Sequence, residues 1–238
     1  MKNTIAVPQS IANFFPALKF LLKIFALVIL AAVFCSCVGV KMDMTVRADG
    51  SVTMSLEYRV SRMLESLGRL DGNERWPVIP TGKEDFQRTM ARLPRLSLTS
   101  FSSSDDGTDL ISKAVIASKN IEDMLGFLDP SSAQQGSRVV HEQANGKNRL
   151  MLVLLDGNLS IEPELLALAD STFAGYTLGF SLSVPGDASL VLTDSSGAQL
   201  KTVPESARLT QQGKKTSFSM DMKDLFKLSD GLGLEFTW

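Results

Sequence analysis

The chain has two cysteines, Cys35 and Cys37, and both follow directly on an apolar segment near its beginning. Residues 24–34 carry no charge, and the only charged residues before them are three lysines. A basic stretch followed by an apolar run of this length is typical of a signal peptide. A disulfide between cysteines so close together would be badly strained, so we expect a different chemistry for them.

The four residues Phe34-Cys35-Ser36-Cys37 resemble a bacterial lipobox, in which a large apolar residue and two small residues precede the cysteine that is acylated. Cys35 does not fit as the acylated residue, because Phe34 stands where a small residue is required. We therefore expect cleavage before Cys37, acyl chains such as palmitate on Cys37, and a lipid anchor on the exported side of the cell membrane or outer membrane. Several acyl chains bind more firmly than one, since each buried CH₂ contributes about 0.8 kcal/mol.

A retained membrane anchor is the alternative interpretation of the same segment. Extended to Val40, the apolar run reaches 17 residues, the lower limit for a helix that spans a bilayer. In this alternative the two cysteines have no role. The lipobox resemblance favours a lipoprotein-type signal peptide over residues 1–36.

Other residues with catalytic or metal-binding chemistry are scarce. His141 is the only histidine and stands beside Glu142 in a strand pattern, where a histidine is usually structural or solvated. With Cys37 acylated and Cys35 removed, neither an ordinary zinc site nor a thiol nucleophile can form. No glycine-rich phosphate motif precedes a helix pattern. We expect no enzymatic activity, no cofactor and no metal ion, although carboxylates from distant strands could still meet.

Two pairs of acidic residues are interpreted as parts of a turn and of a helix start, and a calcium site is not favoured for them. Asp105 and Asp106 lie in a Ser-Ser-Asp-Asp-Gly stretch that lacks the alternating ligands and final glutamate of a calcium loop. A polar hairpin tip is favoured for them. Glu162 and Glu164 suit the first turn of a helix, where acids interact favourably with the helix dipole.

Net charge limits the partners. The 238 residues include 24 basic and 26 acidic ones, and removing the three leader lysines leaves 21 against 26, a net charge of −5. An acidic body has no electrostatic reason to bind nucleic acid or an anionic membrane surface. We expect membrane contact through the lipid on Cys37, and a lipid, glycolipid or envelope protein as the partner.

Alternating apolar and polar residues predict three hairpins. Their strands cover residues 38–46 with 52–60, 96–101 with 110–117, and 139–143 with 150–155. Asp49-Gly50 and Asn145-Gly146 are the strongest turn signals among them. Further strands are predicted at 176–184, 190–192, 207–210, 218–222 and 232–238, and helices at 61–70, 83–93, 120–128, 163–169 and 222–228.

These elements predict an α+β fold, with a mainly antiparallel sheet of hairpins and short helices packed on one face. Residues 37–238 are long enough for a single domain, with a weak internal boundary near 156–162. The strand pattern starts at Val38, so almost no tether separates the lipid from the fold. We expect the domain to sit flush with its membrane.

Two motifs resemble the LppM-like family of bacterial lipoprotein domains. Cys37-Val38-Gly39-Val40, with Asp49-Gly50-Ser51-Val52 after the first strand, is similar to the start of that domain. Phe180-Ser181-Leu182-Ser183-Val184-Pro185-Gly186 is similar to its later strand, which ends in a Pro-Gly turn. The resemblance implies a non-enzymatic domain of the cell envelope that contacts lipids or glycolipids.

Two functions follow as hypotheses. The first is a binding module for lipids, glycolipids or another envelope component. The alternative is a structural or assembly lipoprotein that docks a protein partner through a sheet edge. An apolar cavity that opens toward Cys37 favours the first, and a filled core with an exposed edge strand favours the second.

Overall fold

The computed structural model describes residues 38–62, 82–128, 137–157, 166–167, 170 and 173–238. The chain divides into two units, residues 1–36 and 37–238, and every described residue belongs to the second. The predicted signal peptide, Cys37, most of the two helices at 61–70 and 163–169, and most of the boundary near 156–162 lie outside the described residues, so these stay predictions. In the described part of the chain, no helix is long and apolar enough to cross a membrane.

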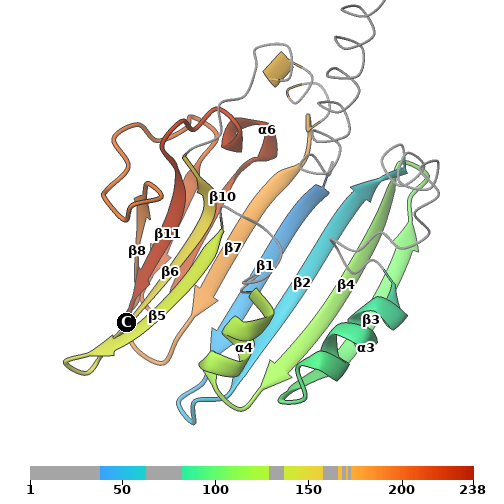
Figure 1. Ribbon diagram of the computed structural model, residues 1–238, viewed down its shortest axis with the longest axis horizontal. Helices are drawn as coiled ribbons and strands as arrows, with labels where there is room; N and C mark the ends of the chain where they lie inside the picture. The colour runs from blue at the N-terminus through green and yellow to red at the C-terminus, as the bar shows by residue number, and fades with distance from the viewer. Residues whose placement is uncertain (1–37, 63–81, 129–136, 158–165, 168–169, 171–172) are drawn as a thin grey trace, which may run out of the picture. The chain divides into compact units, whose positions relative to one another are not determined.

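The larger layer is a seven-stranded sheet, here named sheet A, in the order β3-β4-β2-β1-β7-β10-β9 (Figure 1). Its strands are β1 (Val38–Val46), β2 (Val52–Ser61), β3 (Leu96–Asp105), β4 (Asp109–Ser118), β7 (Thr177–Ser183), β9 (Arg208–Gln212) and β10 (Lys215–Asp221). Neighbouring strands are antiparallel except β1 and β7, which run parallel. The mainly antiparallel character is confirmed, and the parallel pairing of β1 with β7 was not predicted.

A second sheet of four strands, here named sheet B, has the order β5-β6-β11-β8 and is antiparallel throughout. Its strands are β5 (Arg138–Ala144), β6 (Lys147–Asp156), β8 (Ser189–Thr193) and β11 (Gly231–Thr237). The rings of Phe180 in sheet A and Phe236 in sheet B lie 5.1 Å apart, centroid to centroid. The α+β class holds, but the prediction of one sheet covered by helices was incomplete, because a second sheet covers part of that face.

The three predicted hairpins are confirmed, each with its turn residues in the backbone conformation that the sequence required. Gly50 and Gly107 have φ angles of 84° and 87° in the turns of β1–β2 and β3–β4. Asn145 and Gly146 both have positive φ, 53° and 75°, as a tight two-residue hairpin turn demands.

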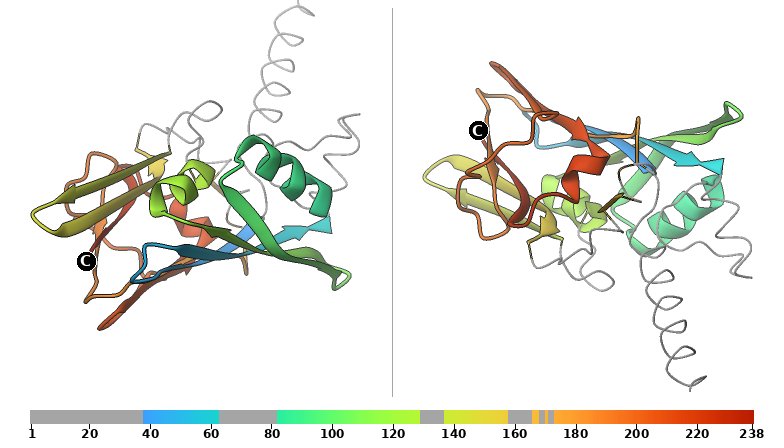
Figure 2. Two further views of the ribbon diagram at one scale, coloured as in Figure 1. Left: turned by 90° about the horizontal axis from the view of Figure 1, so that it is seen from below. Right: turned by 90° about the horizontal axis from the view of Figure 1, so that it is seen from above.

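Helices α3 (Lys83–Arg92) and α4 (Ile121–Leu128) lie on the same side of sheet A as sheet B (Figure 2). The Asn120 side-chain oxygen accepts a hydrogen bond from the Asp123 backbone N–H at 2.8 Å, so Asn120 caps α4 as its sequence position predicts. α6 (Met222–Leu225) is shorter than the predicted helix at 222–228.

Apolar side chains from sheet A and from these helices form a buried core. Phe86 of α3 and Met124 of α4 are fully buried, and so are Met54, Leu56 and Ile116 of sheet A. The rings of Phe86 and Phe101 lie 5.5 Å apart. Each such side chain contributes roughly 1.5–3 kcal/mol when it is fully buried. The inner face of sheet A and the two helices therefore share one apolar core.

Candidate functional site

The first described residues are already held inside sheet A. β1 begins at Val38, directly after Cys37, and Val38 pairs with Val60 of β2. Val40 pairs with Tyr58 of β2 on one side and with Leu178 of β7 on the other. The predicted strand start is confirmed. A group attached to Cys37 would thus precede β1 directly, and β1 lies between two other strands of sheet A.

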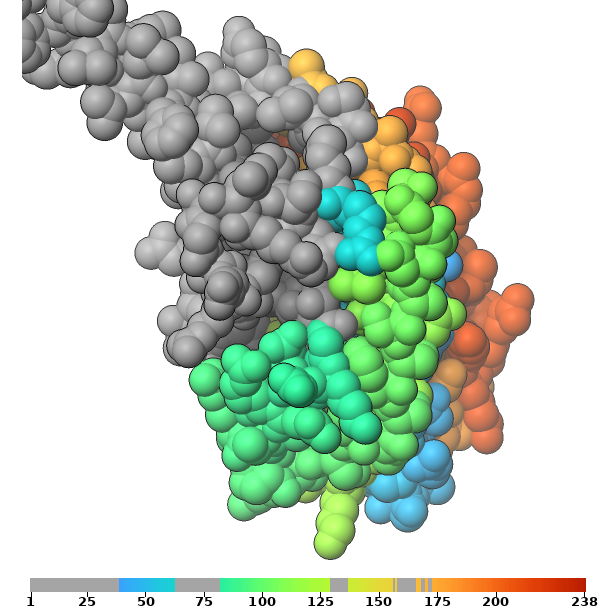
Figure 3. Space-filling view, turned by 90° about the vertical axis from the view of Figure 1, so that its right-hand side faces the viewer, coloured from blue at the N-terminus to red at the C-terminus, as the bar shows by residue number. Residues whose placement is uncertain are grey.

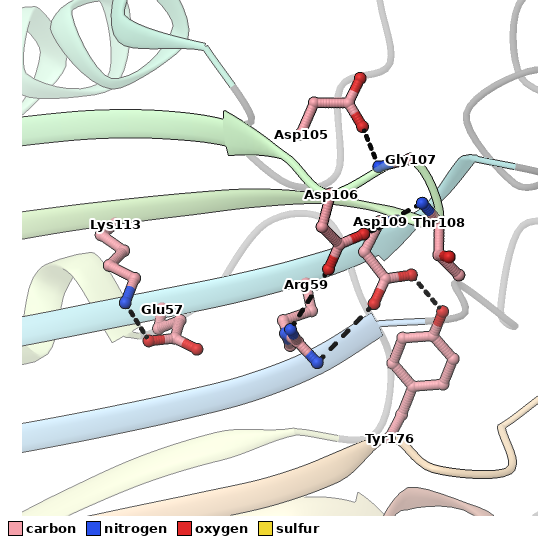
Figure 4. Close-up of polar contacts among 9 residues, drawn as sticks. All are labelled: Glu57, Arg59, Asp105, Asp106, Gly107, Thr108, Asp109, Lys113 and Tyr176. Carbon is pink, nitrogen blue, oxygen red and sulfur yellow. Dashed lines mark hydrogen bonds and ion pairs between the residues drawn. The ribbon is translucent and has the colours of Figure 1, made fainter.

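A polar cluster lies at this end of sheet A and consists of Arg59, Asp106, Asp109 and Tyr176 (Figure 4). Asp109 begins β4 and is only 5% exposed. The Tyr176 hydroxyl donates a hydrogen bond to Asp109 Oδ1 at 2.6 Å. The two guanidinium nitrogens of Arg59 lie 3.8 Å from Asp109 Oδ2 and 3.5 Å from Asp106 Oδ2. The cluster thus joins β2 and β4 to the segment that leads into β7.

This connection passes across β1 at Gly39. Tyr176 and Asp109 come from opposite sides of β1 and β2 in the strand order. A Cβ atom at Gly39 would lie 3.5 Å from Tyr176 Cδ1 and 3.6 Å from Arg59 Cβ. The Tyr176 ring therefore lies over Gly39, at distances where a Cβ atom would make ordinary van der Waals contact. The start of β1 is held by its neighbours and by this cluster.

The β3–β4 hairpin supplies the acidic members of the cluster, and its carboxylates accept hydrogen bonds from their own turn. Asp106 Oδ1 accepts from the N–H groups of Thr108 and Asp109 at 3.0 and 2.7 Å. Asp105 Oδ1 accepts from the Gly107 N–H at 2.9 Å, and its other oxygen pairs with Arg62. The predicted polar hairpin tip is confirmed.

These contacts lower the pKa of both aspartates from the ordinary value. For Asp105 the Arg62 side-chain hydrogen bond is the largest cause, followed by the Gly107 N–H. For Asp106 the N–H groups of Asp109 and Thr108 dominate. Hydrogen bonds to the charged carboxylate favour that form. Among the described residues, no group of three or more His, Cys, Asp or Glu is placed to hold a metal ion.

An ion pair continues the polar row along the outer face of sheet A. Lys113 Nζ of β4 lies 3.0 Å from Glu57 Oε2 of β2. The acidic side chains of the row contact basic, hydroxyl or backbone groups of this same chain. Such mutual pairing fixes the ends of strands against one another, and we interpret the cluster as a brace at the Val38 end of sheet A.

His141 lies elsewhere, between sheet B and α4. Its Nδ1 is 3.5 Å from Glu122 Oε1, and its ring stacks on Trp238 with centroids 6.2 Å apart. Its Nε2 is buried and has no hydrogen-bond partner among the described residues. These are packing contacts between β5, α4 and the last residue. Glu162 and Glu164 lie outside the described residues.

The sequence did not reveal the polar cluster. Tyr176 continues the apolar alternation of 178, 180 and 182, which predicts a strand residue on the buried face. In the structure β7 begins one residue later, at Thr177, and the Tyr176 hydroxyl reaches Asp109, 67 positions earlier in the chain. Local periodicity carries no information about a contact at that separation.

Comparison with known proteins gives a distant likeness of fold. No protein-family model matches the chain, and no curated protein sequence matches it. Among solved structures, the folded domain of Mycobacterium tuberculosis LppM is similar, with a TM-score of 0.41 and 8% identity over 85% of this chain and 89% of that domain. The similarity to an LppM domain is a distant likeness of fold, and neither a function nor a site residue is transferred from it.

Proposed function

We propose that this chain is an exported lipoprotein, anchored by lipid on Cys37, whose body stands directly on the membrane as a non-enzymatic docking module. The single observation that carries the proposal is the start of β1 at Val38, between β2 and β7. A flexible linker of n residues would give a reach of roughly 5–6 Å × √n. Here that reach is almost absent, so the anchor would hold the start of β1 close to the membrane.

The polar character of this end supports contact with lipid headgroups. Besides the polar cluster, Lys227 Nζ near α6 lies 2.9 Å from Asp170 and 3.0 Å from Asp224. The Met222 N–H donates to the Tyr176 carbonyl oxygen at 2.9 Å, which puts α6 beside the start of β7. Burying such charged groups in hydrocarbon is costly. The anchored end therefore suits the headgroup layer, with only the acyl chains inserted.

Large apolar side chains from both sheet A and the helices meet in the core, which favours protein docking in this proposal. Phe86, Leu56 and Met124 are fully buried where sheet A meets the helices. In this proposal a protein partner contacts the surface or the edges of the sheets. A lipid or glycolipid module is the alternative outcome, and lipid found by mass spectrometry in organic extracts of the purified body, residues 38–238, would support it.

Labelling with a fatty-acid analogue tests the anchor. The full chain is expressed in a bacterial host that processes lipoproteins, either unchanged or with Cys37→Ala or Cys35→Ala. We expect the label on the unchanged chain and on Cys35→Ala, and an unlabelled, uncleaved precursor with Cys37→Ala. Label that survives Cys37→Ala but is lost in Cys35→Ala would contradict the assignment.

A further inference from the structure

The β5–β6 hairpin carries the only Asn-Gly pair of the chain, Asn145-Gly146. Its tip projects from the rest of the described residues (Figure 1 and Figure 2). Every residue from Gln143 to Lys147 is exposed. β5 is an edge strand of sheet B and pairs only with β6. The Asn-Gly pair is therefore open to solvent at a free edge of the sheet.

An asparagine followed by glycine can lose its side-chain amide group without an enzyme. The backbone nitrogen of the glycine attacks the asparagine Cγ, a C–N bond forms, and the amide nitrogen leaves as ammonia. The attacking nitrogen gives its proton to solvent, and the leaving nitrogen takes one from solvent. Water then opens the cyclic imide at either carbonyl carbon, which yields aspartate or isoaspartate. Glycine favours the attack because it has no side chain to hinder it.

The groups that would react are free at this turn. Among the residues that the structure describes, neither the Asn145 side chain nor the Gly146 N–H has a hydrogen-bond partner. The attack needs rotation about the Cα–C bond of Asn145, so the tip has to open for a moment. Only the pair Ala144 and Lys147 closes the turn. Openings of this kind cost little free energy where few buried contacts hold the backbone.

The β1–β2 turn offers a contrast, because its reacting groups are occupied. Its tip, Asp49-Gly50, belongs to the blue atoms in the lower part of Figure 3. Asp49 Oδ1 accepts hydrogen bonds from the Ser51 N–H and hydroxyl at 3.0 and 2.7 Å. The Gly50 N–H donates to the Arg47 carbonyl oxygen at 2.9 Å. An ionised carboxylate is also a poor target for a nucleophile, so this turn is protected in a way that Asn145-Gly146 is not.

The other two asparagines in the described part of the chain are held by their surroundings. Asn120 Nδ2 donates to Asp123 Oδ2 at 2.8 Å, and its Oδ1 caps α4. The next residue, Ile121, is buried and branched at Cβ. Asn148 is half-buried, and its backbone N–H and carbonyl oxygen are both bonded to Trp238, at 2.8 and 3.1 Å. Both serve as internal references for Asn145.

We propose that Asn145 is a modification site at which the chain deamidates spontaneously, and that the isoaspartate product loosens the β5–β6 hairpin. In isoaspartate the main chain runs through Cβ and Cγ, which adds a CH₂ group to the connection between the strands. A two-residue turn does not accommodate this addition, because loop length determines the turn type and the register. The contacts of His141 with Glu122 and Trp238 depend on β5 and would be lost with it.

Mass spectrometry of the full chain in isolated membranes tests the modification. The membranes are incubated at mildly alkaline pH, where the glycine N–H loses its proton more readily, and the chain is digested at intervals. We expect at least about tenfold more deamidated peptide at Asn145 than at Asn120 or Asn148, because an exposed tip opens more often than a buried segment. Equal conversion at all of these asparagines would overturn the proposal. So would an unchanged Asn145 in the folded chain when the same chain in urea is converted there.

Hydrogen exchange of residues 138–144 tests the loosening. Asn145→Asp is the matched control, because it carries the new carboxylate on an ordinary main chain. Aged chains that contain isoaspartate should exchange these amide hydrogens faster than fresh chains, whereas fresh Asn145→Asp should exchange them like the unchanged chain. Residues 52–56 of β2 should exchange equally in all samples. Equal exchange of β5 in aged and fresh chains would overturn the loosening, and so would fast exchange in fresh Asn145→Asp, because the charge alone would then explain it.

Discussion

The two faces of sheet A are built from the same strands, yet they differ in burial and in polarity. On the inner face of β2, Val52, Met54 and Leu56 are fully buried under the helices and sheet B. On the outer face of the same strand, Ser55 is exposed and Arg59 takes part in the polar cluster. Alternation with a period of two separates these faces. The buried inner face supplies most of the stability, while polar side chains on the outer face hold strand ends in place.

The largest effect is expected from the inner face. Leu56→Ala should destabilise the body, residues 38–238, by about 2–5 kcal/mol, since it removes a fully buried side chain and leaves a cavity. Ser55→Ala, its exposed neighbour, should change the free energy of unfolding by less than about 0.5 kcal/mol. Urea denaturation followed by circular dichroism measures both. Equal effects would mean that the two faces are not distinct.

A smaller effect is expected from the brace on the outer face. Asp109→Ala removes the buried acceptor of the Tyr176 hydroxyl and the partner of Arg59, and should cost about 1–3 kcal/mol. Asp43→Ala, at an exposed position of the same face, should cost less than about 0.5 kcal/mol. A double-mutant cycle with Tyr176→Phe should show a coupling of at least about 0.5 kcal/mol. If the effects of the two substitutions on the free energy of unfolding simply add, the polar cluster does not act as a brace.

The smallest effect concerns the exposed hairpin tip and depends on pH. Because the folded-state pKa values of Asp105 and Asp106 are lowered, their contribution to stability is present above the unfolded value of about 3.9 and is lost as pH falls through the folded values. NMR titration of the carboxyl carbons at low salt should place both pKa values below the ordinary one. Arg62→Gln should raise the pKa of Asp105 more than that of Asp106. The same shift at both sites would contradict the separate causes assigned above.

The sequence correctly predicted the elements that depend on local patterns, namely the hairpins and two of the helices. Alternation and the Asp-Gly and Asn-Gly turns identified the three hairpins, and α3 and α4 were predicted within one residue of their observed limits. The parallel pairing of β1 with β7 and the insertion of β11 between β6 and β8 were not predicted. Strands distant in sequence are brought together by the packing of their inner faces, which no local pattern encodes. The contact between Tyr176 and Asp109 escaped prediction for the same reason, while the chemistry expected at Cys37 rests on the lipobox residues alone.

Energy transfer to the bilayer tests the central claim, that lipid on Cys37 holds the end of sheet A against the membrane. A donor dye is attached to Thr108→Cys, in the exposed turn beside the polar cluster, or to Ala48→Cys, in the exposed β1–β2 turn at the other end of β1. β1 has nine residues, so the two ends of the sheet differ in height by roughly 30 Å. With an acceptor dye on lipid headgroups, we predict strong transfer from position 108 and weak transfer from position 48. Equal transfer from both positions, or stronger transfer from position 48, would contradict the account.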